Sequence, residues 1–273
     1  MHNYLAKKRP AMEKVLPPAE VLPKNSREQD IVLRLLTGFV RHRTCKGAIL
    51  ARLLTIPHRG RVFYNLAALE EIWPDLRSTI LADIQHCRKE HVVLFVDEDG
   101  KEWVCSQTGH SIPDGEEGEQ MLATLCSMYV PYTGEASYHG TTFAALPAIT
   151  GLPLDAVRES MLASGLSEED KARMERLLAG VEPIESSVTG LSPQGRGFVH
   201  MLPAPKDNNA RTTSKVMLRV NAAAAVGCQF YLTPNGVVLC PQLIPKEALT
   251  VDWPATAALP ANYKKVKHAL KKN

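Results

Sequence analysis

The spacing of apolar residues changes from a helical period to a strand period near residue 91, and this change constrains the fold most. A helix is predicted from Ser26, where Gln29 three residues later completes the pattern of a capping box. Further helices are predicted through residues 66–72 and from 75 to about 89. The stretch VVLFVDEDGKEWVCSQ (92–107) predicts two strands joined by a Glu-Asp-Gly turn. Helices followed by a β-hairpin are typical of a winged-helix module, although any small α+β domain gives the same pattern.

The second half of the chain begins near Ala136 and ends in strands. Residues 154–179 carry a charged helical pattern, and three short β-branched or aromatic runs follow: SKVMLRVNA, CQFYLT and VVLCPQLI. The last two runs are separated by Pro234-Asn235-Gly236, which predicts a turn. We therefore expect an α+β protein with two lobes, divided into a flexible leader (1–25), an N-terminal winged-helix-like lobe (26–115), a linker (116–135), a C-terminal β-rich lobe (136–252) with a helical insertion at about 152–187, and a basic tail (253–273).

Composition and charge exclude several classes of protein. The 273 residues are 45% hydrophobic, and no apolar run approaches the roughly 20 residues needed to cross a membrane. The basic N-terminus has no apolar segment behind it, so we expect an intracellular protein, cytoplasmic or nuclear, without a membrane partner. None of the six cysteines forms a CxxC pair or a zinc-ligand spacing, which predicts reduced thiols and no metal. The net charge of +3 is too small to identify a nucleic-acid-binding protein.

Four short segments have residues suited to binding a ligand. Arg41-His42-Arg43 ends the first helix and can bind phosphate, or can be a solvated helix terminus whose charges complement the helix dipole. The segment 138–141 (YHGT) combines a histidine, a glycine and a hydroxyl, but structural histidines beside turns are common. The segment 195–200 (GRGFVH) places an arginine between glycines just before a strand. The segment 107–111 (QTGHS) is a polar turn after the hairpin.

Together, in this order, these motifs resemble the RNA 2′-phosphotransferase family. That family has an Arg-His pair at the end of an early helix, then QGHS, YHGT, GL…RxHVHL and a final segment ending in NGVWL. This chain has Arg41-His42, QTGHS, YHGT, GLSPQGRGFVHML and GCQFYLTPNGVVL. Gly60-Arg61-Val62 matches the family's Gly-Trp-Val turn only loosely. The resemblance spans roughly residues 28–252, apart from the insertion.

The resemblance implies an RNA-binding winged-helix lobe and an ADP-ribosyltransferase-like lobe that holds NAD. The implied enzyme is an NAD-dependent transferase that removes the internal 2′-phosphate left at a tRNA splice junction. It consumes NAD, needs no metal, and releases nicotinamide and ADP-ribose 1″,2″-cyclic phosphate. We expect it to act as a monomer on tRNA or another RNA bearing a 2′-phosphate. The implied phosphate-binding catalytic residues are Arg41, His42 and Arg196. The residues implied to line the NAD site are His139, Gly140, Thr141, His200, Asn235 and Gly236.

The chain departs from the family pattern at two positions. The family's arginine before QGHS falls at or within one residue of Cys105, and the HVH pair has become Phe198-Val199-His200. Loss of one charge-stabilising donor typically slows a reaction about a hundred- to a thousandfold, and Lys101 replaces an arginine only imperfectly. Two further functions therefore stay open: an ADP-ribosyltransferase that stalls at the phospho-ADP-ribosylated nucleic acid, and a catalytically weakened RNA- or ADP-ribose-binding protein.

Overall fold

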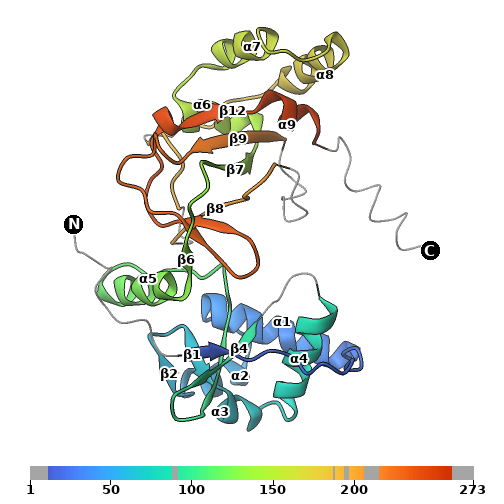
Figure 1. The fold of residues 1–273 in the computed structure, drawn as a ribbon, viewed down its shortest axis with the longest axis vertical. Coiled ribbons are helices and arrows are strands. Elements are labelled where there is room, and N and C mark those ends of the chain that lie inside the picture. The colour runs from blue at the N-terminus through green and yellow to red at the C-terminus, as the bar shows by residue number, and fades with distance from the viewer. Residues whose placement is uncertain (1–11, 88–91, 187, 194–196, 206–214, 260–273) are drawn as a thin grey trace. The chain divides into compact units, whose positions relative to one another are not determined.

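The computed structural model describes residues 12–87, 92–186, 188–193, 197–205 and 215–259. The chain combines helices and sheets as an α+β protein, as the sequence predicts (Figure 1). It divides into two compact units. The first holds residues 12–130 of the described chain together with Gly197 and Thr233–Asn235, and the second holds the other described residues from Pro131 onward.

The first unit contains a five-stranded sheet with the strand order β1-β4-β5-β3-β2. Its strands are β1 (Met12–Lys14), β2 (His58–Arg59), β3 (Phe63–Asn65), β4 (Val93–Asp97) and β5 (Glu102–Cys105). Its helices are α1 (Arg27–His42), α2 (Ala48–Leu54), α3 (Leu66–Glu70), α4 (Leu76–His86) and α5 (Glu116–Met128). Helices α3 and α4 confirm the two predicted helical segments, whereas α2 was not predicted. Leu36, Phe39, Tyr64, Ile80 and Val104 belong to one buried cluster that joins the helices to the sheet.

Helix α1 begins and ends with well-defined caps. The capping box is confirmed: the Ser26 hydroxyl accepts from the Gln29 backbone N–H at 3.3 Å, and the Gln29 side chain accepts from the Ser26 N–H at 2.7 Å. An N-cap of this kind typically stabilises a helix by about 1 kcal/mol. At the other end Arg43 is left-handed, with φ 50°, and its N–H donates to the Phe39 carbonyl. These caps fix where α1 stops, and therefore where Arg41 and His42 lie.

The predicted hairpin is confirmed as β4 and β5, which pair in antiparallel register from Val93–Cys105 to Val96–Glu102. The Asp97 carboxylate organises its turn by accepting from the backbone of Asp99 and Lys101 and from the Trp103 indole at 2.9 Å. Burial opposes ionisation of Asp97, but these hydrogen bonds and the Arg59 guanidinium at 2.9 Å lower its pKa below the usual value. The hairpin carries β5 directly into the 106–111 segment.

Two predicted boundaries of the first unit were wrong. Residues 12–14 of the expected leader form β1 on the edge of the sheet, and Gln85 and His86 of α4 hydrogen-bond the backbone of residues 18–22. Residues 116–128 of the expected linker form α5, which buries Met121 and Leu125. Acidic residues in a first turn stabilise a helix through its dipole, so the acidic 116–119 segment starts a helix rather than a linker.

The second unit is built on two sheets, and the pairings β10–β11, β11–β8, β12–β9 and β9–β7 are antiparallel. One has the order β6-β10-β11-β8 and the other β12-β9-β7. Their strands are β6 (Val130–Pro131), β7 (Ala136–Thr141), β8 (Val199–Met201), β9 (Val216–Asn221), β10 (Tyr231–Leu232), β11 (Val238–Cys240) and β12 (Leu249–Val251). The three predicted strand runs correspond to β9, β10 and β11. Reciprocal backbone hydrogen bonds of 2.8 and 2.7 Å between Tyr138 and Leu202 tie β7 to the residue after β8.

The helical insertion is part of the core of the second unit. Its helices follow α6 (Leu146–Thr150) and are α7 (Leu154–Leu162) and α8 (Glu168–Leu178), seen beyond β12 in Figure 1. Val157, Met161, Met174 and Leu178 are buried in the same cluster as the strands. The predicted tail was wrong from its start, because residues 253–257 form α9 (Trp253–Ala257). Trp253 is buried and donates to Ser160 at 3.1 Å. The rest of the tail from residue 260 lies outside the described residues, as does the leader up to residue 11.

Candidate functional site

Arg41 lies at the end of α1 and is held by the segment that follows β5. Its Nε donates to the hydroxyl of Ser106 at 2.7 Å, and that hydroxyl donates to the Thr108 carbonyl at 3.0 Å. Ser106 is fully buried, so the guanidinium plane is set from the interior of the unit. A hydrogen bond to a charged group is typically worth about 1.5–3 kcal/mol. Arg41 is therefore a positioned cation rather than a loose surface side chain.

His42 is exposed and is held by the same segment. Its Nδ1 shares a hydrogen bond of 2.8 Å with the Ser111 hydroxyl, and the Ser111 N–H donates to the Arg41 carbonyl at 2.8 Å. One serine thus bonds the backbone of the arginine and the ring of the histidine. The structure brings Arg41 and His42 together with the QTGHS segment, as members of one cluster in the first unit.

His110 stabilises this segment from within. Its Nε2 lies 2.7 Å from the Ser106 carbonyl, and because a carbonyl only accepts, Nε2 carries the proton. Burial lowers the pKa of His110 to about 4, and the cations of Arg41 and His42 act in the same direction. His110 is therefore neutral near pH 7 and serves to shape the loop. Gly109 beside it has φ +84°, a backbone conformation that favours glycine.

Cys105 stands just before this segment. The side chain is fully buried at the end of β5, and its thiol lies 3.1 Å from the Ser106 carbonyl. Burial raises the pKa of the Cys105 thiol far above its usual value, so the group is neutral. A neutral buried thiol cannot act as a cation toward phosphate. The departure noted in the sequence thus corresponds to an apolar position in the structure.

Of the Gly-Arg-Gly segment (195–197), the structure describes only Gly197. It belongs to the first unit, has φ +68°, and packs so closely on Ile112 that a Cβ would overlap that side chain. Ile112 directly follows Ser111, the partner of His42. Arg196, predicted as the third phosphate-binding residue, lies outside the described residues, so its position stays a prediction.

His139, Gly140 and Thr141 lie together on β7 of the second unit, paired with Leu218, Met217 and Val216 of β9. His139 Nδ1 is 2.9 Å from the His200 carbonyl, and His200 Nδ1 is 3.1 Å from the Phe198 carbonyl. Each Nδ1 faces a carbonyl and therefore donates, so in each neutral ring Nε2 is the acceptor nitrogen. The structure thus brings the predicted His139 and His200 together across β7 and β8.

Asn235 and Gly236 form the turn between β10 and β11, as the sequence predicts, with Gly236 at φ +78°. The Asn235 side chain accepts from the Thr233 hydroxyl, which fixes it within its own turn. Asn235 belongs to the first unit, whereas Gly236 and His139 belong to the second. Asn235 is therefore not grouped with His139 and His200, although the sequence predicted that all of them line one NAD site.

The structure adds residues that the prediction missed. Ser106 and Ser111 hydrogen-bond Arg41 and His42, and His110 shapes the loop between them. His110 and Ser111 belong to the QTGHS motif noted in the sequence, but no role was predicted for them, and Ser106 lies just before that motif. Ser106 is 65 residues from Arg41 in the chain. Such a partner is recognised from sequence only through the motif as a whole, because no local pattern links the two positions.

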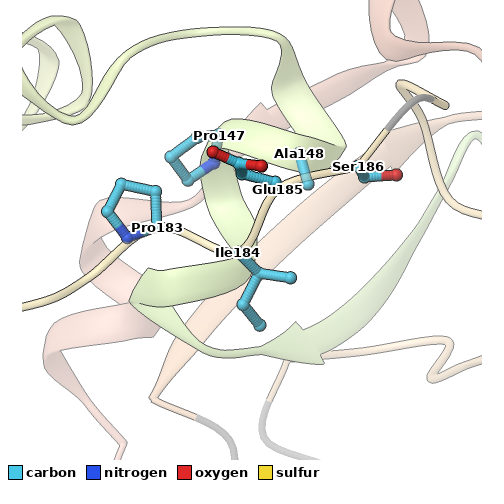
Figure 2. Close-up of a pocket in the computed structure, with 6 residues that line it drawn as sticks. All are labelled: Pro147, Ala148, Pro183, Ile184, Glu185 and Ser186. Atoms are coloured by element: carbon cyan, nitrogen blue, oxygen red, sulfur yellow. The ribbon is translucent and has the colours of Figure 1, made fainter.

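A separate hollow of about 600 Å³ lies on the second unit (Figure 2). Pro147 and Ala148 of α6 form one wall, and residues 183–186 form the other. In Figure 2 Glu185 extends toward Pro147 while Ile184 points away from it. None of the predicted site residues that the structure describes lines this hollow.

The described residues contain neither a metal-binding group nor a membrane-spanning helix. In this part of the chain no group of three or more His, Cys, Asp or Glu side chains is placed to hold a metal ion. Nor is any helix there long and apolar enough to cross a membrane. Comparison of the sequence with protein-family models and with curated proteins finds no match.

Proposed function

We propose that this protein is an NAD-dependent RNA 2′-phosphotransferase that acts on RNA bearing an internal 2′-phosphate, such as spliced tRNA. The observation that supports this most is the anchoring of Arg41 and His42 by Ser106 and Ser111 at 2.7 and 2.8 Å. A solvated helix terminus needs no buried hydroxyl to orient its arginine. A guanidinium held in one plane suits a phosphate, which it can bind through two parallel hydrogen bonds.

In this proposal the two units have different tasks. The first, a winged-helix-like lobe, binds RNA and positions the 2′-phosphate at Arg41 and His42. The second, an ADP-ribosyltransferase-like lobe, binds NAD through residues 139–141 and His200. The hydrogen bond from His139 Nδ1 to the His200 carbonyl supports this, because it fixes the orientation of a histidine ring that is proposed to contact the ADP-ribose part of NAD.

The proposed reaction has two steps. A 2′-phosphate oxygen attacks C1″ of the nicotinamide ribose, and the glycosidic bond breaks as nicotinamide leaves with its electron pair. The 2″-hydroxyl then loses its proton as its oxygen attacks phosphorus, the bond from phosphorus to the RNA 2′-oxygen breaks, and that oxygen takes up a proton. Arg41 holds the phosphate in line and stabilises the charge that develops on it. His42, exposed beside it, is the residue that would deliver the proton.

A second function is favoured by the environment of Cys105. Because its thiol is buried and neutral, it contributes no positive charge to the second step. An ADP-ribosyltransferase that completes the first step and stalls would leave the RNA carrying phospho-ADP-ribose. A weakened binding protein of the same fold would perform neither step.

The test is incubation of the full chain with NAD and a short RNA that carries one labelled internal 2′-phosphate, with products resolved by gel and mass. We expect the label to leave as ADP-ribose cyclic phosphate. RNA that gains and keeps an ADP-ribose mass would replace the phosphotransferase by the stalled transferase. Unchanged RNA and unchanged NAD would exclude both enzymes. Arg77→Ala is the matched control for Arg41→Ala, because Arg77 forms a surface ion pair with Glu102 in the same unit.

A further inference from the structure

Two further arginines meet at one carboxylate in the first unit. Glu117, in the first turn of α5, pairs with Arg43 at 3.7 Å and also pairs closely with Arg61, in both cases through Oε1. One carboxylate cannot neutralise two guanidinium groups, so the triad keeps an excess positive charge. Its side chains are 27–42% exposed, which leaves them within reach of a ligand from solvent.

The backbone at both arginines is unusual. Arg43 has φ 50° and Arg61 has φ 55°, and among the described residues only Asp75 is a further non-glycine residue in this region. Glycine would take up that conformation without strain. Arginine therefore occupies, at both positions, a conformation that glycine would adopt more readily.

The Arg61 backbone is also fixed on two sides. A Cβ on Gly60 would lie 2.6 Å from Oγ1 of Thr124, so the turn packs tightly on α5. On the other side the buried Tyr64 hydroxyl donates to the Arg61 carbonyl at 3.3 Å. The guanidinium is thus presented from a rigid turn, which lowers the entropy lost when it binds an anion.

We propose that Arg43 and Arg61 form a second phosphate-binding site, and that it takes a phosphate group of the RNA substrate. The choice of RNA rests on the proposed function. Arg43 follows His42 directly, so the site continues the run of basic side chains that begins at Arg41 at the C-terminal end of α1. Glu117 occupies it as a carboxylate in place of the phosphate, and RNA binding displaces Glu117.

The simplest alternative is an ion-pair network that only ties α5 to its neighbours. The two interpretations predict opposite effects of one substitution. If Glu117 competes with phosphate, Glu117→Gln strengthens RNA binding because both guanidinium groups lose their internal partner. If the triad is only a tie, Glu117→Gln does not strengthen binding and lowers stability about as much as Arg61→Ala does.

The experiment measures binding of a short single-stranded RNA with one internal 2′-phosphate by the full chain, without NAD, over a range of salt concentrations. We expect Arg61→Ala and Arg43→Ala each to weaken binding by about tenfold, and to reduce the slope of affinity against salt by about one unit. Glu117→Gln should strengthen binding severalfold. Arg77→Ala and Glu102→Gln are matched controls, because Arg77 Nε meets both Glu102 oxygens at 2.9 Å in the same unit, and they should change nothing.

The same RNA without its 2′-phosphate identifies which phosphate is bound. An equal loss on both RNAs in Arg61→Ala assigns the site to a backbone phosphate. A loss confined to the 2′-phosphorylated RNA assigns it to the 2′-phosphate. Unchanged binding in Arg61→Ala, or unchanged or weaker binding in Glu117→Gln, would overturn the proposal.

The test is independent of turnover. If Arg61→Ala weakens RNA binding but the wild-type chain consumes no NAD, the proposed enzyme activity is wrong and the second phosphate site stands. If the wild-type chain turns over normally but Arg61→Ala leaves RNA binding unchanged, the second phosphate site is wrong and the proposed activity stands.

Discussion

Arg41 and His139 each donate a hydrogen bond from a side-chain nitrogen, but the acceptors of these two bonds differ in kind. Arg41 donates to a side chain, the Ser106 hydroxyl, whereas His139 donates to the backbone carbonyl of His200. The carbonyl is placed by strand pairing, since His200 pairs with Leu239 of β11. The hydrogen bond from His139 should therefore survive a change of the side chain at position 200, because every residue there keeps the backbone carbonyl. The Arg41 contact with Ser106 depends on the identity of a buried side chain, so this contact should be the more sensitive to substitution of its acceptor residue.

The largest expected effect is at Arg41. Arg41→Ala should slow release of the 2′-phosphate about a hundred- to a thousandfold, because it removes a group that stabilises charge in the transition state. Arg41→Lys should recover little, since lysine lacks both the Nε that meets Ser106 and the fork that matches phosphate. Single-turnover rates with labelled RNA measure both. A variant with near-normal rates would remove Arg41 from the reaction.

The next effect concerns the pH dependence of the first unit. The folded pKa of His110 is about 4, below its usual value of 6.5, so stability is present above pH 6.5 and is lost as pH falls toward 4. The loss amounts to at most about 3 kcal/mol. Hydrogen exchange of α1 peptides between pH 7 and 4 measures it.

The comparison for this measurement is His110→Gln, which cannot take up the proton. Its stability should change less with pH than that of the wild type, although its stability at pH 7 will be lower. Equal pH dependence in the two proteins would show that His110 titrates normally in the folded state.

The sequence predicted the helix cap and the turns, because each of them is determined by residues close together in the chain. The Ser26 capping box, the 97–100 hairpin turn and the Pro-Asn-Gly turn each depend on residues within a few positions of one another. The strand β1 was missed because its three residues gain their conformation from β4, more than eighty residues away. Helix α9 was missed because five residues are too few for a periodic pattern, and its stability comes from the burial of Trp253.

The candidate site divides in the same way. Arg41, His42 and His139 were proposed from motifs, and the structure shows how each is held. The pairing of Glu117 with Arg43 and Arg61 could not be predicted from the sequence, because the three residues lie in separate segments of the chain that only the fold brings together. An acidic residue in the first turn of a helix has a sufficient local explanation, which concealed its second role.

The smallest expected effects test the difference between the two kinds of acceptor directly. Ser106→Ala should reduce phosphate release by about tenfold, since loss of one hydrogen bond to a charged group costs on the order of 1.5 kcal/mol. Ser111→Ala should act similarly through His42, and Ser111→Thr should restore activity, because the exposed position accepts a methyl group and keeps the hydroxyl. A merely structural serine would show no such rescue.

Substitution of His200 by alanine should leave the chemical shift and tautomer of His139 unchanged in NMR spectra, because the carbonyl remains. If the His139 ring changes tautomer in that variant, backbone and side-chain acceptors are equally vulnerable, and the contrast between the two regions does not hold.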